Sequence, residues 1–226
     1  MKKRIVYIFL FFLSCVSFNA YAQLRDAGGI GSISVSKEIS KVTELSFEQE
    51  LRLDQGLSML NRSSTSIGAD FTIVRRLLKA EVDYILMYRR EDFDLYEFRH
   101  RFTAGFVFQQ RYSRFIFKLR TRGQTTLRDE NRGDYKYNPR YVWRNRLQVE
   151  YNIPKSPFRP YISTEIFCPL NSDYGFFMDS YRLIIGTTYR FSKRSELDCQ
   201  IRFDQDVQVA NPKNILYTGI GWNYSF

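Results

Sequence analysis

The chain has 226 residues, a length that suits one domain, and 34 Lys and Arg side chains outnumber 24 Asp and Glu to give a formal net charge of +10. A single histidine and three scattered cysteines supply no ligand cluster, which argues against a metal centre. No stretch approaches 18 uninterrupted apolar residues, which argues against a membrane-spanning helix.

The start of the chain has the pattern of a secretory signal peptide. A basic start, Lys2–Arg4, is followed by the apolar run Ile5–Val16. The A-x-A cleavage signal consists of Ala20 and Ala22 and is followed by Gln23. We therefore expect residues 1–22 to be a signal peptide and residues 23–226 to form one exported domain.

Two other interpretations of the basic, exported chain were weighed. A lipoprotein signal would use Leu13-Ser14-Cys15, but Phe12 stands where such signals usually carry Leu. The basic excess is also typical of nucleic-acid binding. Export separates the protein from nucleic acid, however, and the charges alternate with apolar residues instead of clustering, so we expect no nucleic-acid partner.

Eleven segments alternate between apolar and polar residues, which is the period of a strand with one apolar and one polar face. In chain order they are 29–37, 42–53, 65–75, 79–89, 96–108, 114–124, 141–151, 161–168, 180–190, 196–206 and 215–226. Many exceed the five or six residues usual in globular strands and approach the roughly 9 to 11 that cross a bilayer. The sequence therefore predicts an all-β protein, a closed antiparallel transmembrane β-barrel of about 10–12 strands.

The connections between these segments alternate between shorter and longer. The shorter ones are near 37–41, 76–78, 110–113, 152–160 and 192–195, and the longer ones are near 54–64, 90–95, 125–138, 169–179 and 207–214. Bacterial outer-membrane barrels show this pattern, with the short turns facing the periplasm. Because such barrels have an even strand number, we expect ten strands, with the first segment outside, or twelve, with residues 24–37 forming two.

The alternation alone does not say which face points outward. The export signal, the abundance of aromatic residues and the last segment favour an apolar face against lipid. In that segment Gly221, Tyr224 and Phe226 resemble the carboxy-terminal signal read by the barrel assembly machinery, although Gly219 replaces its expected polar residue. We thus expect the outer membrane as location, and its lipid and that machinery as partners. The alternative is a soluble periplasmic barrel that binds lipid inside.

Three parts of the chain carry a family resemblance. The strand Leu45–Arg52, the stretch Glu97–Phe102 and the final segment resemble the uncharacterised outer-membrane barrel family catalogued as domain of unknown function 2490. The resemblance covers nearly all of the chain after the signal peptide. It implies a barrel fold and an outer-membrane location, and it brings neither an activity nor catalytic residues nor a cofactor.

The polar face is unevenly charged along the chain. An acidic wall is predicted from Glu44, Glu48, Glu50, Asp70, Glu81 and Asp83. A basic wall is predicted from Arg99, Arg101, Lys118, Arg120, Arg122, Arg144 and Arg146. One interpretation is an ion-pair network that plugs a small lumen and leaves a structural or binding scaffold. The other is a narrow, porin-like water path that selects small polar or anionic solutes.

Catalysis is the alternative from another functional class. The one histidine, His100, alternates with Phe98 and Phe102 and is expected on the apolar face, away from the charged residues. A lipid hydrolase could combine His100 with a serine such as Ser113, but a triad needs all its members within hydrogen-bond reach. We therefore expect no enzyme.

Cys168 and Cys199 lie on segments separated by a strand, so no disulfide is expected.

Overall fold

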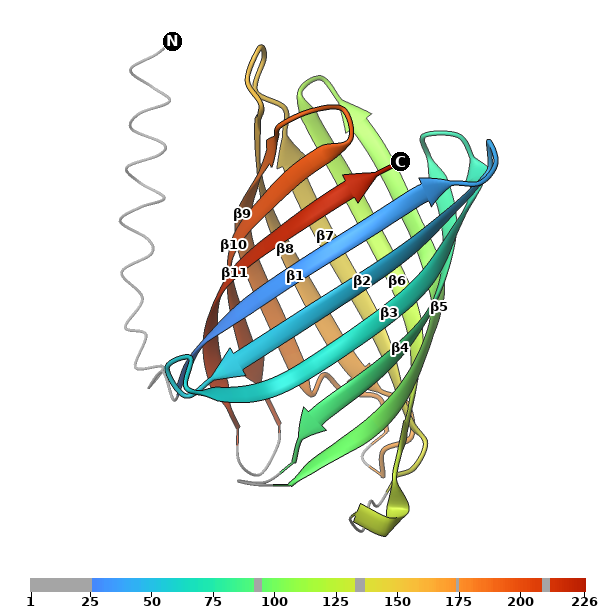
Figure 1. Ribbon diagram of the computed structural model, residues 1–226. Helices are drawn as coiled ribbons and strands as arrows, with labels where there is room; N and C mark the ends of the chain where they lie inside the picture. Colours follow the sequence, from blue (N-terminus) through green and yellow to red (C-terminus); the bar gives the residue numbers. More distant parts are fainter. Residues whose placement is uncertain (1–25, 92–94, 133–136, 174, 209–211) are drawn as a thin grey trace.

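The computed structural model describes residues 26–91, 95–132, 137–173, 175–208 and 212–226, which form a closed β-barrel (Figure 1). The strands are β1 (Asp26–Glu38), β2 (Thr43–Asp54), β3 (Met59–Val74), β4 (Leu78–Arg90), β5 (Tyr96–Tyr112), β6 (Phe115–Arg128), β7 (Arg140–Tyr151), β8 (Phe158–Pro169), β9 (Ser180–Arg190), β10 (Ser195–Asp206) and β11 (Asn214–Ser225). One 3-10 turn, η1 (Glu130–Arg132), follows β6. In these residues no helix is long and apolar enough to cross a membrane. The predicted cleavage residues Ala20, Ala22 and Gln23 lie outside the described part.

Each strand pairs with its neighbours in sequence, and the barrel closes between β1 and β11. The closing pair is parallel, with Asp26 beside Ile215 and Ser36 beside Ser225. Figure 1 shows β1 (blue) and β11 (red) side by side and running in the same direction. The expected range of about 10–12 strands is confirmed at eleven. The expected even number of strands is wrong, because the first segment is one full strand of the barrel. The expected fully antiparallel arrangement is also wrong, because β1 pairs antiparallel with β2 but parallel with β11.

The connections gather at two ends of the barrel. The turn end carries the connections that follow β1, β3, β5, β7 and β9, and the loop end carries those that follow β2, β4, β6, β8 and β10. Because the strand number is odd, β1 begins at the loop end whereas β11 finishes at the turn end (Figure 1). The alternation of shorter and longer connections is present, with one exception.

The exception is the predicted loop 54–64, which is only a tight turn. Residues 59–64 belong to β3, and the turn consists of 55–58, where Gly56 has a positive φ of 64°. Likewise 109–112 continues β5 and 125–128 continues β6. Polar residues continue a strand readily when its inner face is itself polar. Ser64 and Thr126, for example, are both buried in the barrel.

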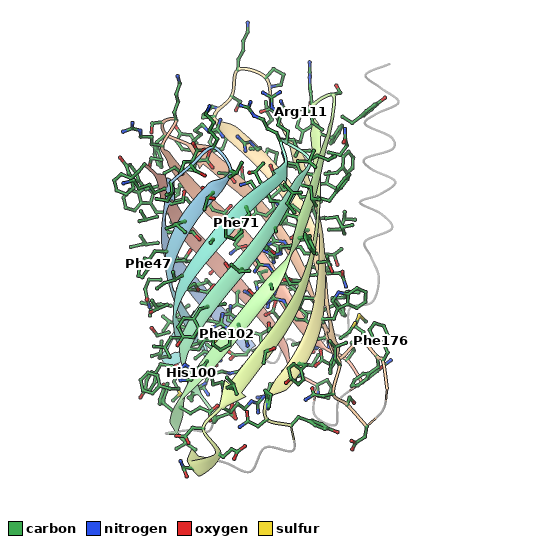
Figure 2. The ribbon with its side chains drawn as sticks, turned by 90° about the vertical axis from the view of Figure 1, so that its right-hand side faces the viewer. Phe47, Phe71, His100, Phe102, Arg111 and Phe176 are labelled. Atoms are coloured by element: carbon green, nitrogen blue, oxygen red, sulfur yellow. The ribbon has the colours of Figure 1, made fainter. Side chains whose placement is uncertain are left out.

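The structure decides which face of the strands is outside. Phe47, Phe71 and Phe102 project outward from β2, β3 and β5 (Figure 2) and are 42–49% exposed. Charged side chains alternate with them and are turned inward, where Arg99 and Glu165 are only 2% exposed. The lumen is therefore a polar core, and the apolar face forms the outer surface.

Aromatic side chains cluster near both ends of the outer surface. At the turn end, Phe115 packs against Tyr151, Phe158 against Tyr189, and Tyr224 against Phe226. At the loop end, Tyr88 packs against Tyr96 and Phe98, and Trp143 packs against Phe176. Between these clusters, Ile162, Ile185 and Ile201 lie in one register row across β8, β9 and β10. On β8 to β10 the exposed surface therefore has an aliphatic middle between two aromatic clusters, whereas on β5 Phe102 and Phe106 are exposed in mid-strand.

Candidate functional site

The candidate site is the charged lumen. All the residues of the two predicted walls alternate with outward-facing apolar residues and lie on the inner face of β2 to β7. They do not form two separate walls, however. The structure joins acidic and basic side chains directly across the strands, and it adds charged residues from β8, β9 and β10 that the sequence argument did not include.

Glu81 on β4 and Arg122 on β6 join the two walls. The Nη2 atom of Arg122 donates to Oε2 of Glu81 at 2.7 Å and lies 3.5 Å from Oδ2 of Asp83. Gly105 of β5 lies between them in register, opposite both Glu81 and Arg122. A Cβ at Gly105 would come within 2.8 Å of the Arg122 Cγ and would also collide with the backbone of Thr121. The absence of a side chain at Gly105 thus lets the ion pair span the middle strand.

Glu165 on β8 accepts hydrogen bonds from three arginines in the same region. Its Oε1 accepts from Arg120 at 3.2 Å and from Arg144 at 2.9 Å, and its Oε2 accepts from Arg182 at 3.1 Å. The guanidinium carbons of Arg144 and Arg182 also lie 4.8 and 5.0 Å from the centre of the Phe167 ring. We call Glu81, Asp83, Arg122, Glu165, Arg120, Arg144 and Arg182 the mid-barrel network.

Glu165 and Arg182 were missed at the sequence level, although their signal was present. Both occupy inner-face positions of predicted strands, alternating with exposed Thr164 and Leu183. Extending the inner-face assignment from β7 through β10 would have found them. Asp204 on β10 would have been found in the same way, and it accepts from Nε of Arg182 at 2.8 Å.

The turn end of the lumen holds smaller ion pairs. The Nζ atom of Lys79 lies 3.2 Å from Oε2 of Glu44 and 3.5 Å from Oδ2 of Asp70. Lys118 pairs with Glu150, another acid that the predicted walls lacked. Charges from both predicted walls therefore find partners locally at this end.

The loop end of the lumen contains a cavity of about 490 Å³. Its lining includes Arg52, Arg62 and Arg89, which are direct register partners on β2, β3 and β4. We call these three residues the arginine row. Glu50 accepts from Arg52 at 3.0 Å and from Arg62 at 2.5 Å, so one carboxylate serves two members of the row. Like charges directly opposite one another on paired strands repel.

Three basic side chains of the lumen have no carboxylate partner among the described residues. The side chain of Arg89 forms neither a hydrogen bond nor an ion pair there, and its buried Nε is unpaired. Arg101 donates from Nε to Thr126 Oγ1 at 3.2 Å, and Arg146 donates to Gln148 Oε1 at 2.7 Å. The lumen thus keeps uncompensated positive charge, most of it beside the cavity.

His100 faces outward as the sequence predicts (Figure 2). Its Nδ1 lies 2.8 Å from the hydroxyl oxygen of Tyr84. Ser113 follows the opposite end of β5, at the turn end, so the structure does not bring it to His100. Cys168 and Cys199 are both free thiols. Within the described ranges, no group of three or more His, Cys, Asp or Glu side chains could hold a metal ion.

The residues of the predicted assembly signal lie on the last strand. Gly221 faces the lumen, where a Cβ would come within 2.7 Å of the Ser32 hydroxyl on β1. Tyr224 and Phe226 face outward, with ring centres 4.9 Å apart. Gly221 thus allows β11 to lie close to the Ser32 side chain at the closure of the barrel.

Comparison with known proteins identifies the family. The family model described as "Protein of unknown function (DUF2490)" matches residues 30–215, which is most of the barrel. The chain belongs to the DUF2490 family. No curated protein matches it in a sequence search. The match begins within β1 and ends at the start of β11, so the DUF2490 region includes both the mid-barrel network and the arginine row.

Proposed function

We propose that this DUF2490 protein is an integral β-barrel of the bacterial outer membrane and acts there as a structural or binding scaffold with a charged, occluded lumen. The observation that carries the proposal is the inverted distribution of residues, with large apolar side chains exposed outside and charged side chains buried inside. An extensive exposed apolar surface marks contact with protein or membrane, and lipid-facing barrels present an apolar band to hydrocarbon.

The dimensions and the closure of the barrel support the same conclusion. Its strands have 11 to 17 residues, which is enough to provide the roughly 9 to 11 that cross a bilayer at a tilt. The parallel pairing of β1 with β11 leaves no open sheet edge, and in hydrocarbon an open edge would leave backbone groups unpaired. The aromatic clusters near both ends of the outer surface resemble the interfacial girdles of membrane barrels.

The two other functional classes fit the geometry less well. A soluble periplasmic barrel that binds lipid needs an apolar interior, whereas buried charges fill much of this lumen. A lipid hydrolase needs a nucleophile beside its histidine, whereas His100 contacts Tyr84 and is remote from Ser113. Both remain outcomes of the experiments below.

The decisive experiment is extraction of the protein from cell envelopes. We expect detergent to be required, and we expect the extracted barrel to migrate differently on gels before and after heating, because a closed barrel resists unfolding until it is heated. Release by carbonate or high salt without detergent would contradict the proposal and favour the soluble barrel. Lipid hydrolysis by the purified protein that is lost in His100→Ala would favour the enzyme.

Orientation follows from the two barrel ends. We infer that the loop end faces the cell exterior and that the turn end faces the periplasm, as in other outer-membrane barrels. We also infer that the barrel assembly machinery recognises β11. With Cys168 and Cys199 replaced by serine, Asn131→Cys should react with a membrane-impermeant maleimide on intact cells. Lys193→Cys at the turn end should react only after the outer membrane is permeabilised. The reverse pattern would contradict this orientation.

The alternative function is a narrow pore for small polar or anionic solutes, and the cavity at the loop end is the observation that favours it. Single-channel recording of the refolded barrel distinguishes an occluded scaffold from a narrow pore. We expect no discrete conductance steps, because the mid-barrel network crosses the lumen. Steps with anion preference that change when Arg120 and Arg122 are both replaced by glutamate would favour the pore.

A further inference from the structure

The cavity at the loop end has more positive charge than its own acids can neutralise. Among the described residues that line it, eight are basic and five are acidic. The acids already have donors. Asp54 accepts from Arg90 at 2.8 Å with both oxygens, Asp179 pairs with Arg140, and Asp204 pairs with Arg182. Of the remaining arginines, Arg52 and Arg62 share Glu50, whereas Arg89 and Arg101 have no carboxylate partner among the described residues.

The arginine row supplies donors that point to a ligand. The Nε atoms of Arg52, Arg62 and Arg89 are all buried and lack hydrogen-bond partners in the described structure. A buried guanidinium N–H without a hydrogen-bond acceptor lowers the stability of the fold, and such unpaired donors are rare in native proteins. Arg52 is only 6% exposed as a residue, so bulk water is a limited substitute. Three such groups on adjacent strands are unexplained by contacts within the protein.

Arg101 adds a fourth positive charge from β5. It lines the cavity together with Arg52, Arg62 and Arg89, which carry the same sign of charge. Its hydrogen bond to Thr126 is neutral and leaves the guanidinium charge uncompensated. Arg62, Arg89 and Arg101 all line the same cavity, so an anion placed there would interact with several of them at once.

We propose that this cavity binds a small molecule that carries two or more phosphate or carboxylate groups, with Arg62, Arg89 and Arg101 as its main contacts. The planar fork of a guanidinium matches the oxygens of both groups, and the volume of about 490 Å³ falls in the range of small-molecule sites. The inference rests on the proposed function, because the loop end must face the exterior for a soluble ligand to reach the cavity from outside.

Isothermal titration of the folded barrel in a non-ionic detergent tests the site, with pyrophosphate and citrate as probes and glucose as the neutral comparison. We expect saturable binding of at least one anion, weakened by salt, and none of glucose. The double variant Arg89→Gln/Arg101→Gln should bind the anion at least tenfold more weakly. Arg159→Gln changes a lumen arginine near Glu150 at the turn end and should bind as the parent does.

Each result decides the inference independently of the membrane proposal. Absence of saturable binding by a parent protein with heat-modifiable migration would overturn the site and leave the membrane barrel intact. Equal weakening in Arg159→Gln would also overturn it, because the effect would then reflect net charge alone. If the double variant does not fold, Arg89→Lys is tested instead, because lysine keeps the positive charge but lacks the planar, forked guanidinium group. Unchanged affinity in that variant would remove Arg89 from the site.

Discussion

In the middle of the lumen, each guanidinium group of the mid-barrel network has a carboxylate partner, because Arg122 pairs with Glu81 and three arginines share Glu165. We call this the matched region. At the loop end, Arg52 and Arg62 share Glu50, but Arg89 has no carboxylate partner among the described residues, and we call this the mismatched region. The matched region links charged side chains of β4, β6, β7, β8 and β9, and the mismatched region surrounds a cavity. The comparison teaches that charge in a lumen supports stability only where partners are present.

The largest expected effect comes from breaking the matched region at Glu165. Glu165→Gln leaves the facing guanidinium groups without their carboxylate, and removal of one member of a buried ion pair costs about 3–5 kcal/mol. We expect this loss in the free energy of unfolding, measured by urea titration of the refolded barrel in lipid. Glu196→Gln is the control, because Glu196 pairs with Arg190 at 2.6 Å near the surface, where an ion pair contributes below about 1 kcal/mol. Equal losses would contradict the central role of Glu165.

A smaller effect is expected from Gly105→Ala, which tests the passage of the Glu81–Arg122 pair across β5. The added methyl group collides with the Thr121 backbone and with Arg122, and overpacking of this kind costs about 1–3 kcal/mol. Gly123→Ala is the matched control on β6, where the nearest atom to a new Cβ is the Ala104 carbonyl oxygen at 3.9 Å. The same urea titration should show little change there. Similar losses in both variants would mean that space at Gly105 is unimportant.

Removal of a charge from the mismatched region should not destabilise the barrel, in contrast to Glu165→Gln. Arg89→Gln removes an uncompensated charge beside Arg62, and we expect the free energy of unfolding to stay the same or to rise by up to about 1 kcal/mol. Urea titration without added multivalent anion measures it. Destabilisation as large as that of Glu165→Gln would show that Arg89 has a structural partner and would erase the distinction between the two regions.

The smallest expected effect is a salt dependence. Salt screens repulsion within the arginine row, so raising the ionic strength should stabilise the parent more than Arg89→Gln, by a few tenths of a kcal/mol. The comparison requires a monovalent salt such as NaCl, because multivalent anions would also test the proposed site. An identical salt response in both proteins would argue that the row is already neutralised.

Much of the fold was predictable from alternation. The eleven segments correspond to the eleven strands, and the period of two places the predicted wall residues on one common face. Polar runs at strand ends were misassigned to loops, as at 59–64, because loop prediction assumes that strands keep an apolar face. The parallel closure was also missed, since it depends on contacts between residues as distant in sequence as Asp26 and Ile215.

The sequence by itself determined that the strands have one apolar and one charged face, because that information is local and repeats every second residue. Only the tertiary structure decided that the charged face lines the lumen, that β1 closes the barrel against β11, and which charges meet. Ion pairing depends on register and on space between strands. Arg122 reaches Glu81 because Gly105 leaves room, whereas Arg89 meets Arg62 because register places them opposite each other.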